Sequence, residues 1–542
     1  MTQTFPSVIP TQAQLETVGT HASPVEPSAG AAARGGSHTI GALSIETFAN
    51  AGPLTYTHDD AIGFFQWLER FGVTRNFWLA DSGVKTWAYY EAYDNWQDTY
   101  GIDADLITYH SGHGGMDGNG VFYAPMGATW SGNDTNAVST NMAVGNEYCR
   151  YLFWSTCFSV RVLDGHSPIR TWAGPNRGLR MILGYETVSV DSPNYGKYFG
   201  NHWNAGESIS TAWLNASWDI SHHQAPSAAA WGANAQEAQD RCYNERFFQW
   251  GTVSNAWMWW RWYYAAAAAR ELNHEIPSDP MMAKLAPMDA RSARNAAEAF
   301  GFDAAGLTAN GIGATVEDGR RRLTIGPDGA LVAQLAKPNL ENHQPLTAPE
   351  AQSVAVEALH RFGLDLEEPM ILDRVAHVNE AGAADDDPET IRGPYQTGTL
   401  VQYRQTINGI PIISPSAGTI QVHVDNDGVA TSVTSRTRSV DDLTEHDSSG
   451  PLREPAPPTG GTTSLQGRGE DPDRLLAKAF SDRLRRLAVS SGDMPTGFGV
   501  VPGTTEVGYD VDGDTASLVA QREVELDFGG GIKKRYLLKA RI

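Results

Sequence analysis

Two short apolar runs, each followed at once by a residue with nucleophilic or basic chemistry, constrain this chain most. The first is Leu106–Tyr109, which passes into His-Ser-Gly-His-Gly-Gly, and the second is Tyr151–Trp154, which passes into Ser-Thr-Cys. Bulky runs bounded by small residues and glycines are typical of buried strands in a parallel sheet. The residues just past such strands lie at the edge where open α/β sheets bind ligands. We therefore expect His113 and Cys157 to meet at one edge of a sheet.

A histidine and a cysteine at one sheet edge form a base and a nucleophile. Cysteine needs such a partner because its ordinary pKa of about 8.5 leaves it mostly protonated at neutral pH. An imidazole can take the proton or hold the thiolate as an ion pair. The glycines that follow His113 lack a Cβ atom, so the backbone can approach a substrate carbonyl and aim an N–H at it. The stretch therefore has candidates for base, nucleophile and oxyanion donor.

The order of these motifs resembles the caspase-like cysteine peptidases, a superfamily that includes caspases, metacaspases and gingipains. The matching features are an apolar strand ending in Ser-Gly-His-Gly and a second strand ending in a small residue and Cys. The resemblance implies a catalytic dyad of His113 and Cys157, with the N–H groups of Gly114 and Cys157 holding the oxyanion. Metacaspases carry an acidic residue and a histidine around the cysteine, whereas Thr156 and Phe158 stand here. The chain therefore looks closest to an uncharacterised bacterial branch.

The resemblance continues downstream over about one domain. Gly178–Gly184 is expected to be the next buried strand, and Gly206–Leu214 looks like the Gly-x-Ser and small-apolar helix that follows it. Related peptidases place part of the substrate pocket after this strand, at the positions of Glu186 and Asp191. A carboxylate there would favour Arg or Lys before the scissile bond, although loop acids are more commonly solvated.

Other functions compete with the peptidase. A caspase-like protein that has lost catalysis and serves in binding or regulation is the main alternative. Zinc binding by His110 and His113 with Cys157 or His166 is a second one, but the two histidines are not held on one helical face and no further metal motif accompanies them. We expect no metal and no cofactor. A carboxylate among Asp81, Glu91, Asp94 and Asp103 could orient the imidazole, although helix caps are the commoner role for such residues.

Charge and cysteine content narrow the partners. The net charge of −23 argues against nucleic acid and anionic membranes as partners, so we expect a protein or peptide substrate. Three cysteines cannot all pair, and a Cys149–Cys242 bridge is the one that a catalytic Cys157 would leave open. The N-terminal 38 residues lack the pattern of a secretory signal and predict a disordered leader and a cytoplasmic protein by default, with secretion as the alternative.

The fold expected for residues 39–275 is α/β: a caspase-like, mostly parallel sheet with flanking helices. Further predictions fill in this domain, namely strands at Leu43–Phe48 and Asn76–Ala80, a helix over Ala61–Leu68 capped by Asp59 and Asp60, a helix over Lys85–Trp96, a long loop over Met116–Asn146 and a buried terminal helix around Trp257–Trp262.

Past a proline-marked boundary at Pro277–Pro280 the composition changes, and we expect an α+β domain over 281–447. Its predicted elements are a hairpin around 326–329 and a helix opened by the capping box at Thr347–Glu350. Val401–Ile412 and Gly418–Gly428 resemble the propeptide modules of secreted metallopeptidases, which chaperone or inhibit an adjoining domain. A linker over 448–472 and an α+β segment over 473–542 complete the prediction. An intramolecular contact between the catalytic and C-terminal regions is expected.

Overall fold

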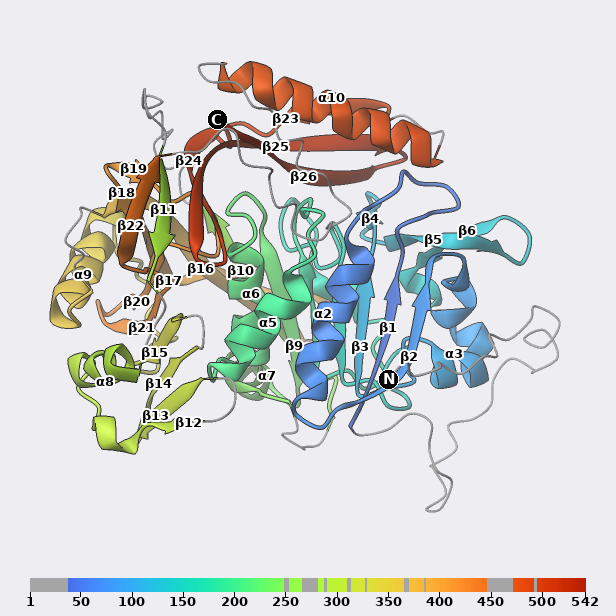
Figure 1. Ribbon diagram of the computed structural model, residues 1–542. Coiled ribbons are helices and arrows are strands. Elements are labelled where there is room, and N and C mark those ends of the chain that lie inside the picture. Colours follow the sequence, from blue (N-terminus) through green and yellow to red (C-terminus); the bar gives the residue numbers. More distant parts are fainter. Residues whose placement is uncertain are drawn as a thin grey trace.

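One long sheet carries most of the molecule, and a smaller sheet with a helix lies across one end of it (Figure 1). The computed structural model describes residues 38–247, 253–265, 281–286, 290–309, 313–326, 329–364, 370–384, 387–445, 471–491 and 495–542. The expected leader, the Pro277–Pro280 junction and nearly all of the expected linker lie outside these residues. The long sheet has the strand order β12-β13-β14-β15-β21-β20-β17-β16-β10-β9-β8-β7-β3-β1-β2.

The end of this sheet formed by the N-terminal half is parallel. Its parallel strands are, in sheet order, β2 (Thr74–Ala80), β1 (Thr39–Ser44), β3 (Ile107–Ser111), β7 (Tyr151–Ser155) and β8 (Met181–Tyr185). Every residue of β3, β7 and β8 is buried. This agrees with the apolar runs in the sequence, because strands covered on both faces need no polar side. The strands predicted at Leu106–Tyr109 and Tyr151–Trp154 are confirmed, and the one predicted within Gly178–Gly184 begins later, at Met181.

Two layers cover the parallel strands. One face packs against helices α2 (Thr57–Glu69), α5 (Tyr195–Asn204), α6 (Ile209–Trp218) and α7 (Ala235–Asn244). The other face packs against α3 (Asp94–Tyr100), α4 (Pro168–Trp172) and a small sheet of β4 (Gly115–Met116), β5 (Phe122–Trp130) and β6 (Asp134–Val138). Phe64 and Phe65 of α2 face the sheet, as the helical spacing predicts.

Three local predictions for the N-terminal half were wrong. The stretch Lys85–Trp96 forms two short 3₁₀ turns and the start of α3 instead of one helix. The stretch Met116–Asn146 contains the small β4–β6 sheet instead of a loop. Asp60 does not cap α2. Its buried carboxylate accepts hydrogen bonds from Tyr109 Oη at 2.8 Å and from Ser111 Oγ at 2.9 Å. The acid therefore ties α2 to the carboxyl end of β3.

The long sheet does not stay parallel. After β8 come β9 (Pro226–Gly232) and β10 (Trp257–Ala265), and every further pairing is antiparallel. The prediction of a mostly parallel sheet therefore holds only for the β2-to-β8 part, and the sheet as a whole is mostly antiparallel. The run Trp257–Trp262, expected as a helix, lies within β10. Short apolar runs are ambiguous by periodicity, and aromatic residues favour the pleated surface of a sheet.

The second half of the long sheet belongs to the C-terminal half of the chain. Its strands are β16 (Ile371–Ala384), β17 (Arg392–Arg404), β20 (Thr419–Asp425), β21 (Ala430–Ser435), β15 (Leu331–Gln334), β14 (Arg321–Ile325), β13 (Ala314–Asp318) and β12 (Thr308–Ala309). The β14–β15 hairpin is confirmed. The capping box is confirmed as well, since Thr347 and Glu350 exchange hydrogen bonds at the start of α9 (Ala348–Arg361). Helix α8 (Ala290–Ala299) and the β18–β19 ribbon (Thr406–Ile407, Ile410–Pro411) complete this half.

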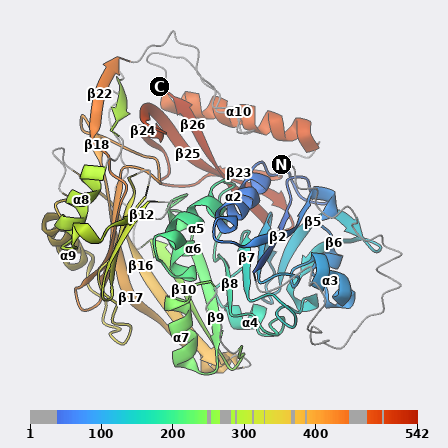
Figure 2. The same ribbon diagram turned by 60° about the horizontal axis from the view of Figure 1, so that its bottom comes forward.

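A second sheet lies across the carboxyl ends of the parallel strands (Figure 1; Figure 2). It contains β22 (Val440–Glu445), β11 (Met281–Leu285), β25 (Thr515–Gly529), β23 (Gly497–Val500), β24 (Glu506–Asp512) and β26 (Ile532–Arg541). Helix α10 (Pro472–Ser491) packs on β25 and β26 through an apolar cluster that includes Leu475 and Tyr536. Helix α10 and strands β23 to β26 make up the segment for which an α+β composition was predicted.

The continuity of the long sheet generates a prediction about truncation. Each residue of β10 pairs with β16, so a chain that ends at residue 275 leaves a nine-residue aromatic strand as an open edge. Exposed hydrophobic edge strands template further pairing. We expect the 1–275 fragment to form soluble oligomers or aggregates at concentrations where the full chain does not, as measured by size-exclusion chromatography with light scattering. A monodisperse, folded monomer of the fragment would contradict this.

Candidate functional site

The site is assembled by the pairing of β3 with β7. These strands run parallel, and Ser111 of β3 is the register partner of Ser155 of β7. His113 and Cys157 each stand two residues past these partners, so both leave the sheet at the same edge. The two loops touch, because a Cβ atom added to Gly114 would lie 2.5 Å from the carbonyl oxygen of Cys157. The two strand ends therefore lie against each other, as the sequence predicted.

His113 is fully buried and held in one tautomer. Its Nε2 lies 2.9 Å from the carbonyl oxygen of Gly52. A carbonyl only accepts, so Nε2 carries the hydrogen and Nδ1 carries the lone pair. Among the described residues Nδ1 has no hydrogen-bond partner. Burial, together with the nearby ammonium of Lys534, lowers the pKa of His113 to about 3 despite the bond to Gly52. The imidazole is therefore neutral at physiological pH, which is the state that a general base requires.

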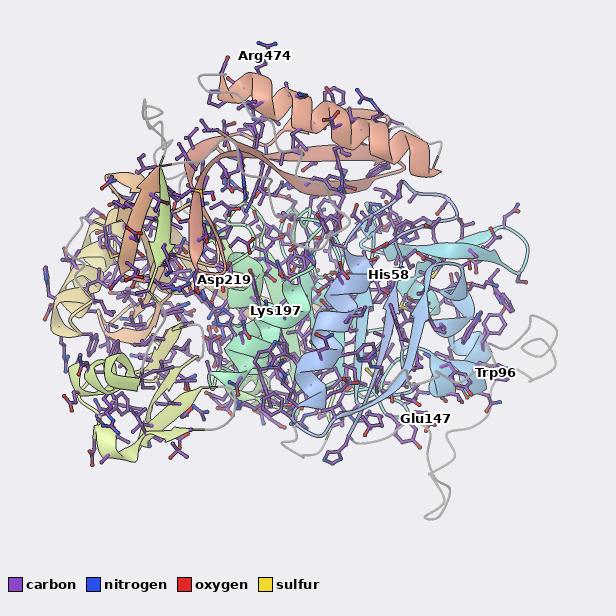
Figure 3. All side chains as sticks on the ribbon, in the orientation of Figure 1. His58, Trp96, Glu147, Lys197, Asp219 and Arg474 are labelled. Atoms are coloured by element: carbon purple, nitrogen blue, oxygen red, sulfur yellow. The ribbon has the colours of Figure 1, made fainter. Side chains whose placement is uncertain are left out.

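The loop of residues 45–56, which supplies Gly52, is anchored at both ends by one hydrogen-bonded network. Ser44 Oγ lies 2.8 Å from Nδ1 of His58, whose Nε2 lies 3.0 Å from Asp81 Oδ2. The other carboxylate oxygen of Asp81 accepts the N–H groups of Glu46 and Thr47. His58 stands at the end of α2 that faces the second sheet (Figure 3). The network fixes the course of the 45–56 loop and so the position of the Gly52 carbonyl.

The orienting group for His113 was not predicted. The acids considered for this role do not bond to it; Asp81 binds His58, and Asp103 accepts the N–H groups of Glu147 and Cys149. A backbone carbonyl takes their place, with the ring of Phe48 packed 4.7 Å from that of His113. No sequence motif marks a carbonyl as a functional group, so only the fold reveals Gly52.

Cys157 is buried among polar neighbours from two distant segments. Its Sγ accepts the N–H of Ser189 at 3.3 Å and lies 3.5 Å from Ser189 Oγ and 3.1 Å from the carbonyl oxygen of Lys533. At the other two cysteines, burial raises the pKa of Cys149 and raises that of Cys242 to about 12. All three thiols are free, so the suggested Cys149–Cys242 bridge does not form.

The two expected oxyanion donors, the N–H groups of Gly114 and Cys157, make no hydrogen bond within the described part of the chain. Unpaired amides beside a nucleophile are suited to a developing negative charge. Gly114 has no room for a side chain, since its added Cβ would also come within 2.9 Å of Thr156 Cβ. Glycine at this position is therefore required by the contact between the two loops.

The two acids expected in a substrate pocket lie in different surroundings. Glu186 turns to the neighbouring loop, where it accepts the N–H of Leu163 and pairs with Arg161 at 3.3 Å. Asp191 lies at the site, where it accepts the N–H of Thr55 at 3.0 Å and pairs with Arg483 at 3.4 Å. Burial raises the pKa of Asp191, and the nearby cations Arg483 and Lys534 counter that rise. Of the two acids, Asp191 is the one that interacts with Lys534, whose charge also acts on His113.

Within the described ranges, no group of three or more His, Cys, Asp and Glu side chains is arranged to hold a metal ion. His110, one of the ligands suggested for zinc, lies inside the core, where its Nδ1 is 2.6 Å from Tyr89 Oη. None of the described helices has the length and apolarity needed to cross a bilayer.

Comparisons with known proteins give one family model and a distant structural similarity. A family model described as a domain of unknown function (DUF6345) matches residues 40–264, which span β1 to β10. No curated protein matches the chain. Among solved structures it is similar to the Arg-specific cysteine proteinase gingipain R (RGPB), with 9% identity and a TM-score of 0.24. That alignment covers 55% of this chain and 63% of the gingipain chain, less than two thirds of it.

The burial of His113 predicts a specific dependence of stability on pH. An unfolded histidine takes a proton near pH 6.5, whereas the folded His113 takes one only near pH 3. Stability is therefore fully present above pH 6.5 and falls as the pH drops toward 3. We expect wild type to lose about 1.4 kcal/mol per pH unit relative to His113→Gln between pH 6 and 4.

The measurement is urea unfolding of both chains across this pH range. His166→Gln is the matched control, because this half-buried histidine should show a much smaller difference. Parallel stability curves for wild type and His113→Gln would show that His113 is not held neutral.

Proposed function

We propose that the chain is a cysteine endopeptidase that uses a dyad of His113 and Cys157. The observation that carries the proposal is the β3–β7 register, which delivers both residues to one sheet edge with their loops in contact. The single tautomer of His113, with a lone pair on Nδ1, and the unpaired N–H groups of Gly114 and Cys157 support the same chemistry.

The proposed reaction proceeds in two halves. His113 Nδ1 takes the proton of Cys157, and the thiolate attacks the carbonyl carbon of the scissile peptide. The N–H groups of Gly114 and Cys157 stabilise the resulting oxyanion. The imidazolium then returns its proton to the leaving amine, which departs and leaves a thioester. Water, deprotonated by His113, attacks this thioester, and the acid product leaves as the thiol is restored. No cofactor takes part in these steps.

The substrate in this proposal is a protein or peptide. Asp191 is the carboxylate near the site, and it favours a basic side chain in the substrate. Glu186 takes no part, since its contacts are with residues 161–163.

The alternative is a catalytically inactive caspase-like protein that binds or regulates a partner. One observation favours this alternative: Cys157 is completely buried, and its thiol donates a hydrogen bond to the carbonyl oxygen of Lys533. The two functions separate by covalent chemistry, because only an active dyad reacts with a mechanism-based peptidase probe in a way that needs both residues.

The dyad generates the first activity prediction. Cys157→Ala should abolish peptide hydrolysis and His113→Ala should lower it by at least about 10²-fold, the lower range for loss of a general base. Hydrolysis of a broad fluorogenic peptide library, and labelling by a thiol-directed peptidase probe, measure the effect. Cys242→Ala is the matched control, since this cysteine is a buried residue of α7 and should be dispensable. Wild-type turnover in either dyad variant would refute the assignment.

Asp191 generates a prediction about specificity. Asp191→Asn keeps the size of the side chain and removes its charge, so we expect kcat/KM for peptides with Lys or Arg before the cleaved bond to fall about tenfold relative to neutral peptides. Glu186→Gln is the control and should leave this ratio unchanged. Equal cleavage after basic and neutral residues by the wild-type chain would show that Asp191 has no such role.

A further inference from the structure

The last strand, β26, carries a buried charge where the pattern calls for an apolar residue. Its inward row comprises Ile532, Lys534, Tyr536, Leu538 and Ala540, all buried. Lys534 is only 2% exposed. Taking an ammonium group out of water costs several kcal/mol unless it is paired, so the position of Lys534 needs a reason beyond packing.

The Lys534 side chain ends in the candidate active site. Its Nζ donates to Ser189 Oγ at 3.0 Å and lies 3.4 Å from the carbonyl oxygen of Gly112. Gly112 belongs to the loop that carries His113, and Ser189 is the residue that also contacts the Cys157 sulfur. The ammonium also acts electrostatically on Asp191 and on His113. The pocket for this side chain is therefore built from both sides of the dyad.

The backbone around Lys534 is bound as an extended peptide would be. Asp191 N–H donates to the carbonyl oxygen of Arg535 at 2.8 Å, and Arg535 N–H donates to that of Ser189 at 3.2 Å. Val190 and Arg535 form a parallel bridge. Main-chain pairing of this kind, with a pocket for an alternate side chain, is a common mode of peptide recognition. The segment Lys533–Arg535 thus occupies the edge beside Cys157 as a short added strand.

The occupant is not placed for cleavage. The Cys157 thiol donates to the carbonyl oxygen of Lys533 at 3.1 Å, so the sulfur faces the oxygen of this peptide group. A productive complex needs the sulfur at the carbonyl carbon and the oxygen at the amide donors. The contact occupies the thiol proton that His113 would have to remove.

Neighbouring contacts hold this segment down. Phe528 lies over the ring of His113 at 5.3 Å, and Tyr123 Oη donates to the carbonyl oxygen of Gly530 at 2.7 Å. Tyr536 Oη bonds to the carbonyl of Pro53, and Arg483 of α10 pairs with Asp191. The β25–β26 hairpin and α10 lie over the carboxyl ends of the parallel strands, and the loops that carry His113 and Cys157 follow two of these strands (Figure 1).

We propose that β26 is a built-in pseudosubstrate, which closes the dyad with its Lys533–Arg535 segment and marks the substrate as an extended peptide with a lysine in the pocket of Lys534. This inference rests on the proposed peptidase function. The propeptide-like stretches Val401–Ile412 and Gly418–Gly428 contribute instead the end of β17, the separate β18–β19 ribbon and β20.

The first test measures the reactivity of Cys157 in the full chain. Lys534→Glu places a carboxylate beside Asp191 and the Gly112 carbonyl, which should expel the segment, whereas Lys534→Arg should keep it. Lys539→Glu makes the same charge change five residues along β26, where the side chain pairs with Asp510 at 2.6 Å. Alkylation by iodoacetamide is followed for each cysteine by mass spectrometry. The buried Cys149 and Cys242 report general unfolding.

We expect Cys157 in Lys534→Glu to react at least about tenfold faster than in wild type, which corresponds to about 1.4 kcal/mol of lost docking free energy. Cys149 and Cys242 should stay unreactive, and Lys534→Arg and Lys539→Glu should behave as wild type. Equal rates for Cys157 in wild type and Lys534→Glu, or equal acceleration of all three cysteines, would overturn the inference.

The second test measures the pocket without relying on activity. A full chain carrying Cys157→Ala and Lys534→Glu is titrated with a fluorescent peptide of the sequence Gly-Gly-Ile-Lys-Lys-Arg-Tyr-Leu, which is residues 530–537. The same peptide with norleucine at the second lysine is the control. The pocket that the displaced Lys534 side chain leaves is lined by Asp191, Ser189 and Gly112. We therefore expect the lysine peptide to bind at least about tenfold tighter than the norleucine peptide. Equal binding of the two peptides would overturn the assigned substrate class.

Peptide hydrolysis by Lys534→Glu then separates the inference from the function beneath it. Faster alkylation together with hydrolysis of lysine peptides supports both. Faster alkylation and lysine-selective binding without any hydrolysis supports the closure by β26 and overturns the peptidase. Hydrolysis by a wild type whose Cys157 is already fully reactive supports the peptidase and overturns the closure.

Discussion

The parallel pairing of β3 with β7 is the constraint on which the rest of the site depends. A shift of two residues in this register would separate His113 from Cys157 by a further 7 Å or so, at about 3.3 Å per strand residue. The register is secured because both strands are buried on both faces, with Trp154 packed in one core and Phe153 in the other. A slip would expose or misplace every one of these side chains. The geometry of the dyad is thus a by-product of core packing.

Local patterns predicted much of this framework, and non-local pairing accounts for what they missed. Some elements could be predicted because each has a pattern within a short stretch of sequence. These elements are the strands β3, β7 and β8 and the capping box of α9. The groups that complete the site could not. Gly52 acts through its carbonyl, Ser189 lies in an unremarkable loop, and Lys534 reaches Gly112 across more than four hundred residues. The run Trp257–Trp262 was predicted as a helix, although it lies in β10, because a buried strand and a buried helix have similar patterns over six residues.

The second half of the molecule is held in register with the first by buried charges as well as by β10–β16 pairing. Asp219 of the first half pairs with Arg436 at 2.7 Å and with His202 at 2.8 Å (Figure 3). Burial lowers the pKa of His202, but the carboxylates of Glu207 and Asp219 raise this pKa to about 9. The histidine is therefore a cation at neutral pH. Buried ion pairs contribute little net stability, but a misplaced partner is costly. They therefore fix the relative position of the two halves.

The tether and the turn before β26 explain how the Lys533–Arg535 segment can both close the site and be released from it. The tether keeps the segment at a millimolar effective concentration or higher, so the contacts at Lys533–Arg535 need little affinity of their own. At the end nearest Cys157, β26 joins β25 through Gly529, Gly530 and Gly531, all with positive φ. A turn of three such glycines can change its course at low steric cost. The other end of β26 stays paired with β25 up to Arg541. Opening can therefore begin at the turn as a local event, since separate parts of a fold unfold at different free energies, while α10 and the remaining strands keep the second sheet intact.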